Sequence, residues 1–210
     1  QTWSDPMFAA RLDGTRIVVT GPDGVEISGH ALAGATIVGI GPAGEPEHIR
    51  IDGVIPDPDD REGDLLLYDL SVPVAGSNGI FRPLCEPDAA GRTAGIPLLG
   101  SWNGDGGYRE DGSITCACLS GVIGKCVRLG YKPWRSSPDG APLRPYHQAC
   151  TRMMRADYCG DGQSHTRDGT LIDIYDTSES ELDIQITGYQ WKWHYKYLGQ
   201  DVEFFSNLTT

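Results

Sequence analysis

Six cysteines spread through the middle of the chain constrain its fold more than any other feature of the sequence. None falls in a Cys-x-x-Cys pair, the usual spacing of zinc and redox sites, and no Cys-x-x-Cys-His sequence for haem attachment occurs. Disulfides are the simplest account of such an even set, and they persist in oxidising compartments. We therefore expect a periplasmic or extracellular bacterial protein whose disulfide candidates are Cys85, Cys116, Cys118, Cys126, Cys150 and Cys159.

Export and partners follow from the start of the chain, its apolar runs and its charge. A chain that begins at Gln1 fits a form from which a signal peptide has been removed, although cleavage of an expression tag leaves the same start. The longest apolar run, residues 31–40, is interrupted by Gly34 and Gly39 and is shorter than the ~20 residues of a transmembrane helix. The formal net charge of -12 disfavours nucleic acid and suits cationic surfaces. We expect an unidentified protein partner, with a basic surface as one option, and leave the oligomeric state open.

Short apolar and β-branched runs between turn residues predict strands in the first half of the chain. The chain has 28 glycines and 14 prolines, more than average usage, which favours many turns. The predicted strands cover residues 16–20, 25–27, 35–40, 48–51 and 65–68. Their spacing is typical of a meander or small barrel, and residues 91–112 read as glycine-rich connections.

Two short helices are predicted after Cys118. The first covers residues 119–129, with Ser120 as its N-cap and Gly130 as its stop. The second covers residues 146–158 after a proline-rich loop, and we expect Cys150 and Cys159, at its middle and end, both to be disulfide-bonded. The predicted fold class is α+β: one strand-rich domain of short antiparallel strands with two short helices, stapled by disulfides.

Three runs of the second half carry a resemblance to a known family. They are residues 121–134, 147–150 and 155–166, and the last contains the tetrad Ala156-Asp157-Tyr158-Cys159. With Leu67-Tyr68-Asp69 and Pro83-Leu84-Cys85 upstream, they resemble the ADYC domain over about Gly24 to Asp176. Proteins with this domain are bacterial and look exported, so the resemblance implies an exported, disulfide-bonded protein. It implies no mechanism.

The aromatic end of the chain resembles a second family. Residues 182–187 alternate apolar and polar side chains like a strand, and five aromatic residues follow in residues 189–197. The segment from about Leu171 to Thr210 resembles the start of the copper domain of cytochrome c oxidase subunit II. The resemblance implies an electron-entry or partner surface at Tyr189, Trp191 and Trp193. That family's copper ligands would lie beyond the aromatic cluster and do not occur here, so no cofactor is expected.

The two resemblances meet at residues 169–176. They divide the chain into an ADYC-like domain at residues 1–176 and an oxidase-like fragment at residues 177–210. Natural fusions usually join complete modules, and neither module is complete here. An artificial or recombined chain is therefore favoured over an evolved bifunctional protein, and we expect residues 182–210 to be dispensable for folding of the remainder.

Combinations of cysteine, histidine and acidic residues offer sharper chemistry. Cys159 with His165 and Asp168, or with His147, has the composition of a nucleophile, its base and an orienting group. A nucleophilic cysteine must be free, however, and five other cysteines make a disulfide the favoured state of Cys159. We therefore expect no catalytic residue.

Metal sites are not expected either. The three histidines of the second half lack both helical i, i+4 pairing and a neighbouring carboxylate arranged as a ligand set; they are His147, His165 and His194. A further group resembles part of a calcium loop but lacks its third oxygen ligand and its terminal Glu; it comprises Asn103, Asp105, Glu110 and Asp111. These patterns favour ordinary polar turns.

The sequence thus favours an exported, disulfide-stabilised structural or interaction module that lacks catalysis. Two alternatives stay open: a docking surface for electron transfer like that of oxidase subunit II, and a Cys-dependent enzyme. The number of free thiols distinguishes the enzyme from the module, because a catalytic cysteine must be reduced.

Overall fold

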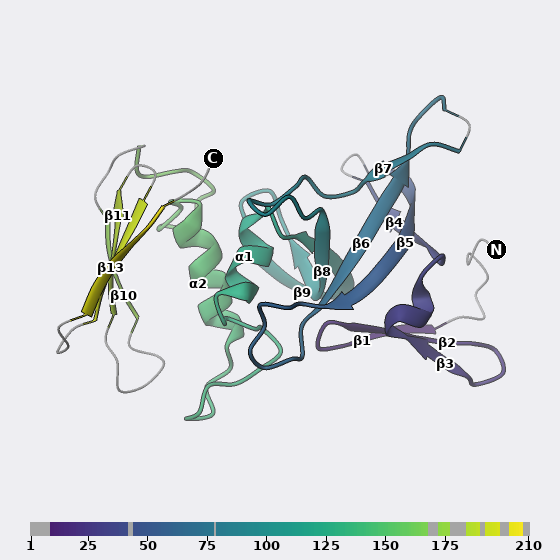
Figure 1. Cartoon of the computed structure of the whole chain (residues 1–210), viewed down its shortest axis with the longest axis horizontal. Helices are drawn as coiled ribbons and strands as arrows, with labels where there is room; N and C mark the ends of the chain where they lie inside the picture. The colour runs from purple at the N-terminus through teal and green to yellow at the C-terminus, as the bar shows by residue number, and fades with distance from the viewer. Residues whose placement is uncertain are drawn as a thin grey trace. The chain divides into compact units, whose positions relative to one another are not determined.

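The computed structural model describes residues 9–41, 44–77 and 79–167, together with the backbone of four strands between residues 172 and 207 (Figure 1). The chain forms two compact units. The first is built from residues up to 103 and from residues 107–130, and the second from residues 104–106 and from residue 131 onward. No described helix is long and apolar enough to cross a membrane.

Antiparallel sheets make up most of the first unit. A three-stranded sheet runs in the order β1-β2-β3, and a larger sheet runs in the order β4-β5-β6-β8-β9, with β7 paired to β6. The strands of the small sheet are β1 (Ala9–Asp13), β2 (Arg16–Thr20) and β3 (Glu26–Ser28). Those of the larger sheet are β4 (Thr36–Ile40), β5 (Pro46–Pro56), β6 (Leu66–Pro73), β7 (Phe81–Pro83), β8 (Ala94–Trp102) and β9 (Tyr108–Cys118).

A buried cluster joins the two sheets of this unit. Ile17 of β2 packs with Ile51 of β5 and Tyr68 of β6, and Leu32 of the short 3-10 helix η1 (Gly29–Leu32) closes the cluster. The Tyr68 hydroxyl accepts a hydrogen bond from the backbone N–H of Ile17 at 3.0 Å, so a polar group in this core has its partner. The predicted strands lie here because their alternating apolar residues supply the buried faces.

The largest difference from the sequence prediction in this unit is the β8–β9 hairpin. Residues 91–112 were expected to be connections, yet most of β8 and the start of β9 lie in this range. Five consecutive residues of β8, from Ala94 to Leu98, are buried, so the strand reads as an unbroken apolar run instead of an alternating one. Both faces of β8 are covered, and the period-2 signal is absent for that reason.

Two α-helices follow, as predicted, with shifted ends. Helix α1 covers Val122–Arg128, and its N-cap is Gly121 instead of the predicted Ser120. The Gly121 N–H donates to the carbonyl of Cys118 at 2.9 Å, and this turn keeps Ser120 outside the helix. Helix α2 covers Arg144–Met154, begins with a proline in its first turn and ends before Ala156, which has a φ of 55°. A positive φ is incompatible with a continuing helix.

A separate four-stranded sheet belongs to the second unit. Its strands pair in the antiparallel order β10-β11-β12-β13 and cover Ile172–Asp176, Ile184–Tyr189, Lys192–Tyr197 and Val202–Asn207. Asp176 of β10 lies opposite Ile184 of β11, so the expected boundary between residues 176 and 177 falls between two paired strands. The strand-rich α+β class, the antiparallel pairing and the disulfide bonding predicted from the sequence are confirmed.

Candidate functional site

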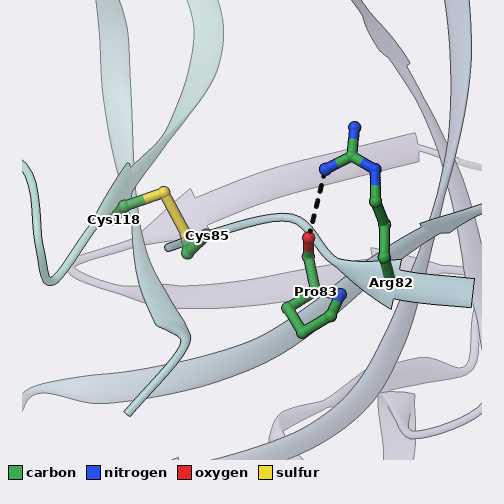
Figure 2. Close-up of a disulfide and its surroundings, with 4 residues drawn as sticks. All are labelled: Arg82, Pro83, Cys85 and Cys118. Atoms are coloured by element: carbon green, nitrogen blue, oxygen red, sulfur yellow. Dashed lines mark hydrogen bonds between the residues drawn. A yellow bond between two sulfur atoms is a disulfide. The ribbon is translucent and has the colours of Figure 1, made fainter. Parts of the chain in front are cut away.

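A disulfide joins Cys85, just after β7, to Cys118, the last residue of β9 (Figure 2). The Cα atoms of these cysteines are 5.4 Å apart, and 33 positions separate them in sequence. Beside the bond, Arg82 Nη1 donates to the carbonyl oxygen of Pro83 at 3.5 Å. Cys126 of α1 and Cys150 of α2 are also disulfide-bonded. Four of the six candidates are therefore oxidised.

The other two cysteines, Cys116 and Cys159, are free thiols. The expectation that Cys159 is bonded together with Cys150 is wrong: α2 ends at Met154, and Cys159 lies in the exposed loop beyond it. The remaining thiol, Cys116, is committed to the core of the first unit. A Cβ on Gly95 would clash with Cys116 Sγ and lie 3.4 Å from Cys85 Sγ, so the thiol packs beside the disulfide. Burial raises the pKa of Cys116 to about 12, which makes it a poor nucleophile.

An ion-pair network holds the acidic loop after β5. The Asp57 side chain is 1% exposed, and Arg128 at the end of α1 donates to its Oδ2 from Nε at 2.7 Å. Arg92 Nε pairs with Asp88 at 3.1 Å, and Arg92 Nη1 pairs with Asp59 at 3.1 Å. Hydrogen bonding from Arg92 keeps the pKa of Asp59 below its ordinary value. Arg128 therefore serves a structural ion pair instead of an anion site.

The family tetrad lies in the loop that follows α2. Ala156 is the one described non-glycine residue with a positive φ, and the next residue, Asp157, is 1% exposed. Further along the loop, His165 Nε2 lies 3.0 Å from Asp161 Oδ1 and 3.2 Å from Oδ2. Hydrogen bonds from the Gln163 backbone N–H and from His165 lower the pKa of Asp161. The expectation that His165 lacks a neighbouring carboxylate is therefore wrong.

One potential ligand atom from each of Asp157, Asp161 and His165 lies within 4.8 Å of the other two. The sequence signal for this group is a spacing of four residues between successive members, interrupted by Gly160 and Gly162. That spacing is a weak signal here because the residues do not lie on a helix, where i, i+4 positions are known to share a face. Their proximity depends on the turns that the loop makes.

Other sequence candidates are placed apart from this loop cluster. His147 is buried in α2, where its side chain has partners, so it is not an open ligand. Asn103 closes a turn: its Oδ1 accepts the Gly107 N–H at 2.6 Å, as expected of a polar turn. The side chains of Asp168, Tyr189, Trp191, Trp193 and His194 lie outside the described residues, although backbone pairing sets Tyr189 opposite Lys192 and Gly188 opposite Trp193.

The first unit also contains an apolar cavity of about 460 Å³. Its wall is made by β2, η1, β4 and their neighbours, with Ile17, Leu32 and Ile37 among the lining residues. No titratable side chain lines it, so the cavity offers apolar contacts and no acid–base or nucleophilic chemistry.

A profile of the ADYC domain family matches residues 29–196, well over half of the chain. The match includes the tetrad and continues through β10, β11 and most of β12. Searches of curated proteins and of solved structures found no match.

Proposed function

The chain belongs to the ADYC domain family, and from that premise we propose that it is an exported, disulfide-stabilised module with a structural or partner-binding role and no catalytic activity. The observation that carries the proposal is the oxidation of Cys85, Cys118, Cys126 and Cys150. Stable structural disulfides form in oxidising compartments and are rare in a reducing cytosol. The periplasm or the extracellular space is therefore the proposed location.

The two free thiols support a non-catalytic role in different ways. Cys116 is held in the core, and burial raises its thiol pKa to about 12, so little thiolate exists near neutral pH. Cys159 is exposed, but it makes no hydrogen bond with His165. A nucleophile and its base need to approach within about 2.6 to 3.2 Å of each other.

A Cys-dependent enzyme is the second candidate function. One observation favours it: Cys159 is free and exposed in the family tetrad, six residues before a histidine that contacts a carboxylate. This arrangement has the elements of a nucleophile, a base and an orienting acid, provided that the loop changes shape when a substrate binds.

Thiol counting tests the proposed module. The native, unreduced protein should show one rapidly reacting thiol with a colorimetric thiol reagent, because Cys159 is exposed and Cys116 is not reactive. Unfolding without reductant should expose the second thiol, and reduction should expose all six. Cys159→Ser is the matched control and should remove the rapid reaction alone. Six reactive thiols in the unreduced, unfolded protein would contradict both the disulfides and the export proposal.

Alkylation rates separate the module from the enzyme. Only a thiolate is strongly nucleophilic, so an ordinary thiol reacts slowly with iodoacetamide at pH 6. We expect Cys159 to react no faster than glutathione at this pH. A much faster reaction that His165→Gln slows would favour the enzyme, since that histidine would then be activating the thiol.

A further inference from the structure

The loop after α2 combines ligand chemistry with a buried, unsatisfied charge. Asp157 is 1% exposed, and neither Oδ1 nor Oδ2 accepts a hydrogen bond from a described residue. An isolated carboxylate is costly to bury, so buried charges in proteins are normally paired or coordinate a metal. The two other potential ligands, Asp161 and His165, are the groups that approach the Asp157 carboxylate within 4.8 Å.

The main chain holds the loop in this arrangement. The His165 N–H donates to the Ala156 carbonyl at 2.9 Å, and the Asp157 N–H donates to the Arg152 carbonyl at 2.8 Å. These two bonds close the loop and tie it to the end of α2. Gly160 has a φ of 73°, and the Arg152 guanidinium lies where a Cβ at this position would be, so only glycine fits. The Asp157 side chain is thus held in place before any ligand arrives.

We propose that Asp157, Asp161 and His165 form a binding site for a divalent transition-metal cation, for which Zn²⁺ is the best match. Zn²⁺ binds both carboxylate oxygen and imidazole nitrogen, at about 2.0 to 2.2 Å. Ca²⁺ and Mg²⁺ prefer sets made of oxygen alone, so the histidine selects against them. A bound cation would replace the contact between His165 and Asp161 and would compensate the buried charge of Asp157.

A second acidic group shows why Asp157 is decisive. Asp60, Glu62 and Asp64 also bring carboxylate oxygens within 4.8 Å of one another. There, however, Asp60 Oδ2 accepts the N–H groups of Asp64 and Leu65 at 3.0 and 2.9 Å. The carboxylate of Asp60 organises its own loop and has no need of a cation, whereas no such donors reach Asp157.

Zinc titration of the full chain, with its disulfides intact and previously bound metal removed by a chelator, tests the proposal. Isothermal titration calorimetry with ZnCl₂ should show one site per chain, and Zn²⁺ should raise the melting temperature because it binds the folded state. Loss of even an outer-shell partner weakens metal binding about 10- to 100-fold, so Asp157→Asn and His165→Gln should each weaken it by at least about tenfold. His48→Gln, at an exposed histidine of β5, is the matched control and should bind Zn²⁺ like the wild type.

Two further variants separate this ligand set from a thiol-based zinc site and from a loss of folding. Cys159→Ser should retain wild-type affinity, since a thiol ligand would show itself by a loss here. Without metal, Asp157→Asn should melt no lower than the wild type, because the substitution removes an uncompensated buried charge. If that variant does not fold, His165→Gln decides the question, since its side chain is partly exposed. Wild-type zinc affinity in His165→Gln, loss of affinity in Cys159→Ser, or binding of Ca²⁺ in place of Zn²⁺ would each overturn the assignment.

Discussion

At the scale of single residues, hydrogen bonds from two serines determine the charge state of Asp111 on β9. Ser101 Oγ donates to Asp111 Oδ2 at 2.6 Å, and Ser113 donates to Oδ1 from its hydroxyl at 2.5 Å and from its N–H at 3.0 Å. These bonds favour the carboxylate and lower the pKa of Asp111 from 3.8 to about 2. The same oxygens are therefore engaged by serines, which explains why this residue does not serve the calcium-like pattern.

We expect Ser101→Ala to raise the pKa of Asp111 toward 3.8, because it removes the largest of the interactions that favour the charged form. The folded-state pKa lies below the unfolded one, so the contribution of Asp111 to stability is complete above about pH 4 and is lost as pH falls toward 2. A carboxyl-carbon NMR titration measures the shift. Ser77→Ala, at a serine that bonds only the Val74 carbonyl, is the control and should leave this pKa unchanged.

At the scale of elements, the Cys85–Cys118 disulfide fastens the loop after β7 to the end of β9. The segment between the two cysteines includes all of β8, whose first five residues are buried. The bond therefore closes a loop around a core strand, and in the chain-entropy model it stabilises the fold mainly by restricting the unfolded chain.

The double variant Cys85→Ala/Cys118→Ala should lower the free energy of unfolding by roughly 3 to 4 kcal/mol, the value expected for a loop of this length. Urea denaturation followed by fluorescence measures the change. Cys159→Ala is the control: its thiol is exposed and unbonded, so the effect should stay within about 0.5 kcal/mol. Equal stabilities of the double variant and the wild type would show that the bond contributes nothing to folding.

At the scale of the whole molecule, the chain separates into two units, and the second contains its own four-stranded sheet. The family match runs to residue 196, past the expected boundary at residue 176. The strand pairing also places β10 and β11 on opposite sides of that boundary. A cut at residue 176 would leave β10 as an unpaired edge, which promotes association between chains.

Two truncations test whether this sheet is dispensable. A chain that ends at Arg167 removes all four strands, and we expect it to unfold cooperatively at the melting temperature of the full chain's first unit. A chain that ends at Asp176 should melt alike but aggregate more, because β10 has lost the backbone partners supplied by β11. Calorimetry and light scattering provide the two readouts. Loss of cooperative unfolding in the Arg167 chain would make the sheet integral to a single fold.

The elements that sequence predicted well are those with local signals. β2 matches the expected strand at residues 16–20 at both ends, and the helix stop at Gly130 lies two residues after α1 ends. β8 was missed because burial on both faces removes its alternation. Ser120 was misplaced as a cap because a competing turn at Cys118 involves a backbone hydrogen bond that composition does not reveal.

The sequence by itself determined the family, the α+β class and the presence of disulfides, because these depend on motif order, hydrophobic periodicity and cysteine count. Only the tertiary structure decided which thiols are free and which carboxylate is buried without a partner. Oxidation depends on which sulfur atoms meet, and the state of Asp157 depends on the solvent and donors that the folded loop excludes. Both are distances between residues, and a chain acquires them only when its packing brings those residues together.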